Sequence, residues 1–166
     1  MRILIVEDNA VSRRMLEATL ASWGHETQSA TDGLDAWEAL KAEAPPDVVI
    51  LDWIMPGLDG LDVCRLAKDS SRGLAVYLIM LTSLGSRRHI EMAREAGVDD
   101  YLTKPLDPGE LKMRLRSAER IVGLTTELRA ARDELSLLRQ QLQGPTEFVE
   151  DVQHAEPQVE PQARAV

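Results

Sequence analysis

The chain has 166 residues, of which 44% are hydrophobic, and a formal net charge of −9. This length allows one domain with a substantial core plus an appendage, and the acidic balance argues against direct nucleic-acid binding or binding to an anionic membrane. One cysteine, Cys64, excludes a disulfide or a cysteine-based zinc site within the chain, and without a signal peptide or an apolar run of membrane length we expect a cytoplasmic protein.

Five short runs of strand character alternate with five stretches of helical spacing, and the run at residues 26–30 is more polar than a buried strand, which suits an edge. The runs predict strands at residues 3–6, 26–30, 48–52, 75–81 and 98–102. Asn9, Ser86 and Asp107 are suited to cap the helices that follow three of them, and Gly24 and Gly97 are suited to end two helices. This alternation predicts an α/β protein with a doubly wound, five-stranded parallel sheet.

The run at residues 48–52 has four consecutive apolar residues, which predicts a strand buried on both faces. It ends at Asp52, and the dipeptide Pro56-Gly57 turns the chain shortly afterwards. Open α/β sheets bind ligands at the carboxyl ends of their strands. We therefore expect Asp52 to lie at the mouth of a binding site.

Other polar residues follow the remaining strands. Glu7 and Asp8 follow the first, Thr82 the fourth and Lys104 the fifth. Three crowded carboxylates require a hard divalent cation such as Mg²⁺, while a lysine can neutralise phosphoryl oxygens and a hydroxyl can donate to one of them. The set predicts in-line attack of a carboxylate on phosphorus, which gives an aspartyl-phosphate.

The order of these motifs resembles a known family. Glu7-Asp8 is followed by Asp52 with Met55-Pro56-Gly57, then by Thr82-Ser83, and finally by Tyr101-Leu102-Thr103-Lys104-Pro105. Over residues 1–119 the chain resembles the receiver domain of two-component response regulators. The resemblance implies a flavodoxin-like (βα)5 fold and a regulator of a phosphorelay rather than an enzyme.

The resemblance also implies a role for each site residue. Asp52 would accept a phosphoryl group from a histidine kinase or phosphotransfer protein. Asp8, Asp52 and the backbone carbonyl of Ile54 would bind Mg²⁺, and Glu7 would assist through water. Ile54 and Leu84 are apolar at positions that face the phosphoryl group in this family, so we expect slow hydrolysis of the aspartyl-phosphate.

The switch residues follow from the same resemblance. Thr82 would bond the phosphoryl group, and Lys104, with a cis bond to Pro105, would pair with it. Tyr101 would turn inward as Thr82 moves. The surface formed by the fourth helix, the fifth strand and the fifth helix would carry the change outward.

The last helix continues beyond a minimal receiver, and its apolar residues alternate spacings of three and four. This pattern predicts a parallel coiled coil over residues 120–143, which would make the chain a homodimer. Across the interface Glu127 would pair with Arg132, and Glu134 with Arg139. The alternative is a helix that folds back on its own domain. The predicted seam is Ile121, Leu124, Leu128, Ala131, Leu135, Leu138 and Leu142.

Residues 144–166 are acidic and proline-containing, which predicts a disordered tail. No effector domain is recognisable, so the chain would act on a downstream protein or be the truncated regulatory half of a diguanylate cyclase or phosphatase. A rival function is a phosphatase with an aspartyl intermediate, but Ile54 stands where haloacid-dehalogenase-like enzymes place a second aspartate. A third is a receiver-like scaffold that never binds phosphate.

Overall fold

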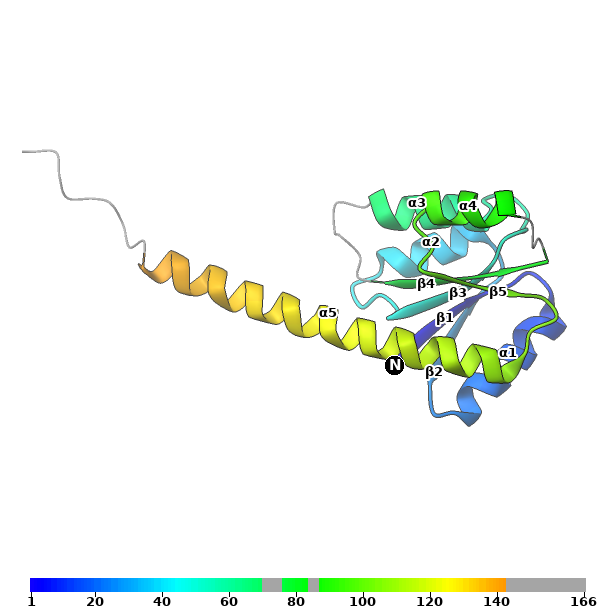
Figure 1. Cartoon of the computed structure of the whole chain (residues 1–166), viewed down its shortest axis with the longest axis horizontal. Coiled ribbons are helices and arrows are strands. Elements are labelled where there is room, and N and C mark those ends of the chain that lie inside the picture. Colours follow the sequence, from blue (N-terminus) through cyan, green and yellow to red (C-terminus); the bar gives the residue numbers. More distant parts are fainter. Residues whose placement is uncertain (70–75, 84–86, 143–166) are drawn as a thin grey trace, which may run out of the picture. The chain divides into compact units, whose positions relative to one another are not determined.

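The computed structural model describes residues 1–69, 76–83 and 87–142, in which five strands alternate with five helices (Figure 1). The strands are β1 (Arg2–Val6), β2 (Glu26–Ala30), β3 (Val48–Asp52), β4 (Tyr77–Thr82) and β5 (Asp100–Thr103). The helices are α1 (Ala10–Ser22), α2 (Gly33–Lys41), α3 (Gly60–Asp69), α4 (Arg87–Glu95) and α5 (Pro108–Leu142).

The strands form one parallel sheet in the order β2-β1-β3-β4-β5, which confirms the predicted doubly wound fold. The central strand, β3, is buried along its whole length, as its four apolar residues predict. In the register Ile50 pairs with Ile5 of β1 and Ile79 of β4, so the most apolar strands lie together in the middle.

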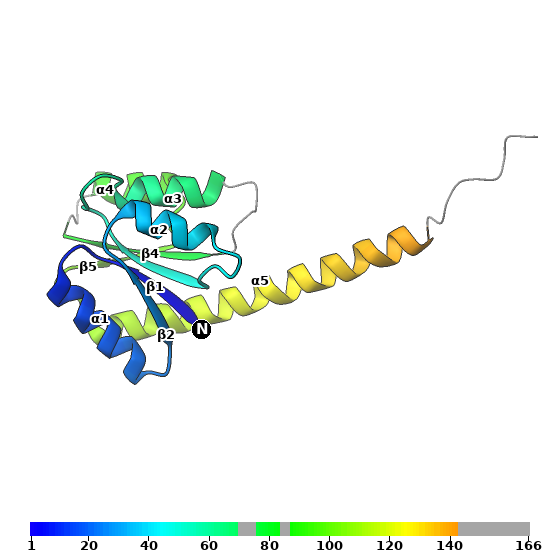
Figure 2. The same cartoon turned by 180° about the vertical axis from the view of Figure 1, so that it is seen from behind.

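Alternate residues of the strands point to opposite faces of the sheet and make two cores. Ile3 and Ile5 pack with residues of α1 and the first turns of α5, while Leu4 and Val6 pack with α2, α3 and α4. The two views show the same division of helices between the faces (Figures 1 and 2). Because helices cover both faces of the sheet, polar side chains of the strands can reach a ligand only at the strand ends.

Side-chain caps fix where the helices begin. The Oδ1 atom of Asn9 accepts hydrogen bonds from the first backbone N–H groups of α1, and Asp107 accepts from Glu110 at 2.7 Å in α5, as predicted. Asp32 caps α2 in the same way, because its side chain accepts from the N–H groups of Leu34 and Asp35. Gly24 (φ 86°) and Gly97 (φ 87°) follow α1 and α4 in the left-handed region that ends helices. The predicted cap Ser86 lies outside the described residues.

The fifth strand begins later than predicted. The N–H of Val98 still donates to the carbonyl of Ala93 in the turn that ends α4, and the bond to β4 comes one residue later, from the N–H of Asp99 to the carbonyl of Leu78 at 3.0 Å. Pairing starts at Asp100, opposite Ile79, and runs to Thr103. The mixed apolar and acidic sequence of residues 98–102 could not separate the end of the turn from the start of the strand.

Helix α5 is continuous from Pro108 to Leu142. Its early residues Leu111, Leu115 and Ala118 are buried in the core, whereas the apolar residues of the predicted seam are exposed. By its internal contacts the chain divides into two units, Met1–Arg129 and Ala130–Val166. Within the described ranges, no helix is long and apolar enough to cross a membrane. The predicted tail, residues 144–166, falls outside these ranges.

Candidate functional site

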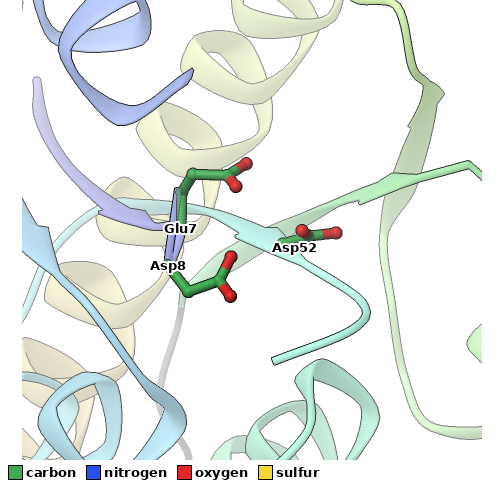
Figure 3. A group of neighbouring side chains, drawn as sticks. All are labelled: Glu7, Asp8 and Asp52. Atoms are coloured by element: carbon green, nitrogen blue, oxygen red, sulfur yellow. The ribbon is translucent and has the colours of Figure 1, made fainter. Parts of the chain in front are cut away.

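Three carboxylates meet at the carboxyl ends of β1 and β3. Glu7 and Asp8 directly follow β1, and Asp52 is the last residue of the neighbouring strand β3. Because these parallel strands are adjacent, their ends lie side by side, and carboxylate oxygens of all three residues lie within 4.8 Å of one another (Figure 3). The structure therefore brings together the acidic residues that the sequence predicted.

Burial separates the roles of the three acids. Glu7 is 1% exposed and Asp52 is 9% exposed, whereas Asp8 is exposed. Lys104, which follows β5, donates through Nζ to Oε2 of Glu7 at 2.8 Å and to Oδ2 of Asp52 at 2.7 Å. The ammonium thus pairs with the two buried carboxylates, whereas the exposed carboxylate of Asp8 lies on the solvent side of the cluster.

The electrostatics of the cluster favour a further cation. Burial alone would lower the pKa of Lys104, but its hydrogen bonds and charge attraction with Asp52 and Glu7 raise that pKa above its ordinary value. Lys104 is therefore protonated at neutral pH. Carboxylates outnumber the one ammonium that is paired with them, and the donors are oxygens, which suit Mg²⁺.

The connection from β3 to α3 passes very close to Asp52. The N–H of Gly60 donates to the carbonyl of Trp53 at 3.0 Å. A Cβ atom at Gly60 would lie 2.3 Å from the carbonyl oxygen of Asp52 and 3.1 Å from the Cα of Trp53. Only a residue without a side chain fits here, so Gly60 sets how the chain leaves the site. Ile54, which follows Trp53 in this connection, is exposed.

The two predicted switch residues lie on β4 and β5. Thr82 is buried at the end of β4, beside the end of β3, and its carbonyl accepts a hydrogen bond from the N–H of Lys104 at 2.9 Å. Tyr101 on β5 is exposed. The Lys104–Pro105 bond is cis, as expected. Leu84, the other apolar residue of the hydrolysis argument, is outside the described residues.

Trp53 packs into the core rather than over the site. It is buried in the core formed with α2, α3 and α4, and its ring meets that of His89 edge-on, with 5.4 Å between centroids and 82° between planes. His89 is half-buried on α4. His25 is also partly buried, because its side chain is 12% exposed and its Nδ1 lies 3.9 Å from Oε1 of Glu119. Neither contact has a spacing signature in the sequence.

Cys64 and Arg13 also bear on what the site can do. Cys64 is fully buried on α3, and burial raises the pKa of its thiol to about 12, so this residue packs in the core and is a poor nucleophile. Arg13 of α1, which the sequence did not single out, donates through Nη1 to the carbonyl oxygens of Glu7 at 2.8 Å and Asp8 at 3.3 Å. In the sequence, the only sign that Arg13 could belong to the site was its position in the first helical turn after the acidic residues that end a strand.

Comparison with known proteins agrees with this geometry. The family described as response regulator receiver domain matches residues 3–116. Chemotaxis protein CheY1 of Helicobacter pylori is 38% identical over 116 residues, which cover 69% of this chain and 94% of that protein.

Two solved structures share the fold at similar identity. Chemotaxis protein CheY4 of Vibrio cholerae has a TM-score of 0.64 and 29% identity, and the match covers 70% of this chain and 97% of that one. The receiver domain of the sensor histidine kinase PA1611 from Pseudomonas aeruginosa, solved with a magnesium ion in its active site cleft, has a TM-score of 0.64 and 33% identity. That match covers 74% of this chain and 97% of the other. The chain belongs to the response regulator receiver family of two-component signalling.

Proposed function

We propose that this chain is a phosphoryl-accepting switch in which Asp52 is the acceptor. Receiver domains interact with histidine kinases and phosphotransfer proteins, and such a protein would be the donor. The observation that carries the proposal is the pairing of Asp52 with Lys104 at 2.7 Å, beside two further carboxylates at one edge of the sheet. That arrangement presents a nucleophilic oxygen together with charges that can hold a phosphoryl group.

The proposed reaction is an in-line displacement at phosphorus. A carboxylate oxygen of Asp52 attacks the phosphorus of a phosphohistidine, and the new P–O bond forms as the P–N bond breaks. The electron pair of the P–N bond stays on the imidazole, which then takes up a proton from solvent. The product is an aspartyl-phosphate on Asp52.

Lys104 and Thr82 would hold this product. Lys104 carries a full positive charge on a long side chain, so its Nζ can exchange its bond with Asp52 for one with a phosphoryl oxygen while keeping its bond with Glu7. Thr82 ends the strand next to β3, which puts a hydroxyl within the same strand-end layer. The two residues would compensate the charge added by the phosphoryl group.

The acidic cluster would hold Mg²⁺ in this reaction. Asp8 and Asp52, with the backbone carbonyl of Ile54, would supply oxygen ligands, and Glu7 would act through water. When bound, the ion would neutralise the repulsion between the acceptor carboxylate and the incoming phosphoryl oxygens. Exposed Asp8 lies where an ion from solvent would arrive first.

The outward signal would travel through the α4, β5 and α5 surface. Thr82 pairs with Thr103 in the ladder between β4 and β5, so a displacement of Thr82 reaches β5 directly. Tyr101 lies on the same strand and is exposed, which leaves it room to turn inward. Exposed Ile54 offers no polar group to orient an attacking water, which favours a long-lived aspartyl-phosphate.

The second copy of this chain is the proposed partner of the exposed half of α5. A stripe of leucines at heptad spacing stays in contact with water in the single chain, and Leu128 is 61% exposed. In a parallel dimer the stripe would be buried, and Glu127 and Glu134 would face Arg132 and Arg139 of the second copy. Exposed pairs of this kind contribute roughly 0.2–1 kcal/mol each, so they select orientation more than they stabilise. A downstream protein, or an effector domain outside this chain, would read the dimer.

The direct test is phosphoryl accounting with the whole chain, a small phosphodonor and Mg²⁺. We expect capture of one phosphoryl group per chain, with release much slower than capture, and no capture by Asp52→Asn or in the presence of a chelator. Mass spectrometry of digested protein locates the modified residue. Sustained release of phosphate over many turnovers would instead identify a phosphatase, and a folded protein that captures nothing would be a scaffold.

A further inference from the structure

Asp8 is held mainly through its backbone. Only Glu7, Asp8 and Asn9 connect β1 to α1, and the outer two are well fixed. The N–H of Glu7 donates to the carbonyl of Ala30 at 3.2 Å, its Oε2 accepts from Lys104, and the Asn9 side chain caps α1. Asp8 between them is exposed, so packing does not determine the direction of its carboxylate.

Arg13 supplies the restraint that Asp8 otherwise lacks. Its Nη1 bridges the carbonyl oxygens of Glu7 and Asp8, at 2.8 and 3.3 Å, from the first turn of α1. Among the described residues, the bond from Arg13 to its carbonyl is the one hydrogen bond that Asp8 makes. We propose that Arg13 is a positioning residue, which fixes the peptide of Asp8 so that its carboxylate stays aimed at the divalent cation of the acidic cluster. This inference rests on the proposed Mg²⁺ site.

Considered only as a positive charge, Arg13 would weaken Mg²⁺ binding, whereas the proposed positioning of Asp8 strengthens it. A guanidinium bonded to the backbone of Glu7 and Asp8 repels an incoming cation, so removal of its charge should strengthen Mg²⁺ binding if electrostatics were its whole influence. If Arg13 acts by positioning Asp8, its removal should weaken binding, because residues that orient metal ligands typically contribute 10-fold or more to affinity. The sign of the change in affinity therefore separates the two roles.

The experiment is calorimetric titration of the whole chain with Mg²⁺ in the absence of phosphodonor. We expect about tenfold weaker binding for Arg13→Ala than for the natural sequence. Arg14→Ala is the matched control, because it removes the same charge from the next position of the same helix, where the side chain is exposed. Its affinity should stay within about twofold of the natural value, since exposed charges at this range are screened by salt.

Unfolding in a chelator, measured on the same variants, separates positioning from general loss of structure. Should Arg13→Ala fail to fold, Arg13→Gln is titrated instead, because it keeps part of the side chain while being too short to bridge both carbonyls. A folded Arg13 variant that binds Mg²⁺ as tightly as the natural sequence, or more tightly, would overturn the inference. Absence of Mg²⁺ binding by the natural sequence would instead overturn the proposed metal site on which it rests.

Discussion

Replacing Lys104 with methionine should lower the free energy of unfolding by about 2 kcal/mol at neutral pH without divalent cations. The variant keeps the side chain's length but leaves Glu7 and Asp52 buried beside each other with no cation. Removal of one partner of a fully buried ion pair costs roughly 3–5 kcal/mol, and we expect a smaller value because the Lys104 side chain is 26% exposed. Chemical denaturation in a chelator measures this loss.

The pH dependence gives the same prediction a second check. Because folding raises the pKa of Lys104, its contribution to stability is complete below the ordinary value of 10.5 and is lost as pH rises through the higher folded value. On the alkaline side, the difference between the natural sequence and Lys104→Met should therefore persist until strongly alkaline pH. Mg²⁺ should stabilise the variant more than the natural protein, since both cations neutralise the same acids. Equal stability of the two proteins at neutral pH would contradict this account of the cluster.

Replacing Gly60 with alanine should destabilise the protein by about 1–3 kcal/mol, the usual cost of forcing extra volume into a packed site. The new Cβ would lie 2.3 Å from the carbonyl oxygen of Asp52 and 3.1 Å from Sδ of Met80, so α3 or the end of β3 must move. Because that movement displaces Asp52 itself, capture of a phosphoryl group should slow together with the loss of stability.

Gly123→Ala is the matched control for this change. Gly123 lies within α5, and a Cβ there would meet no atom within 4 Å. Alanine is the better helix former by about 0.5–1 kcal/mol, so this variant should be slightly more stable than the natural protein. Equal effects of the two substitutions in thermal or chemical unfolding would show that the close approach at Gly60 is not what matters.

The sequence predicted the features of the fold and site that depend on local pattern. Buried parallel strands are continuous apolar runs, and the polar residue that ends such a run lies at the ligand-binding edge. For this reason the convergence of Glu7, Asp8 and Asp52 could be predicted although they are far apart in the chain. Thr82 and Lys104 follow the same rule from β4 and β5. These inferences need only the strand order, which the alternation of elements constrains.

Contacts that depend on three-dimensional packing could not be predicted. The bonds of Arg13 to two backbone carbonyls, and the edge-on packing of His89 on Trp53, involve no motif or spacing. The close approach at Gly60 also needed the structure, because a glycine after a turn is common for many reasons. The start of β5 was misplaced because the mixed sequence of residues 98–102 does not distinguish the turn that ends a helix from the first residues of a strand.

We propose, as the link between the acceptor and the seam, that occupancy of Asp52 controls association of this chain through the exposed stripe of α5. Its most direct test is sedimentation of the whole chain in Mg²⁺, with and without beryllofluoride as a phosphoryl mimic. Leu128→Lys disrupts the proposed seam, and Leu137→Lys is its control, because Leu137 is similarly exposed at 60% but lies off the seam. We predict that the mimic shifts the natural sequence and Leu137→Lys toward dimer, and leaves Asp52→Asn and Leu128→Lys unchanged. A natural protein whose association state does not respond to the mimic would contradict the claim.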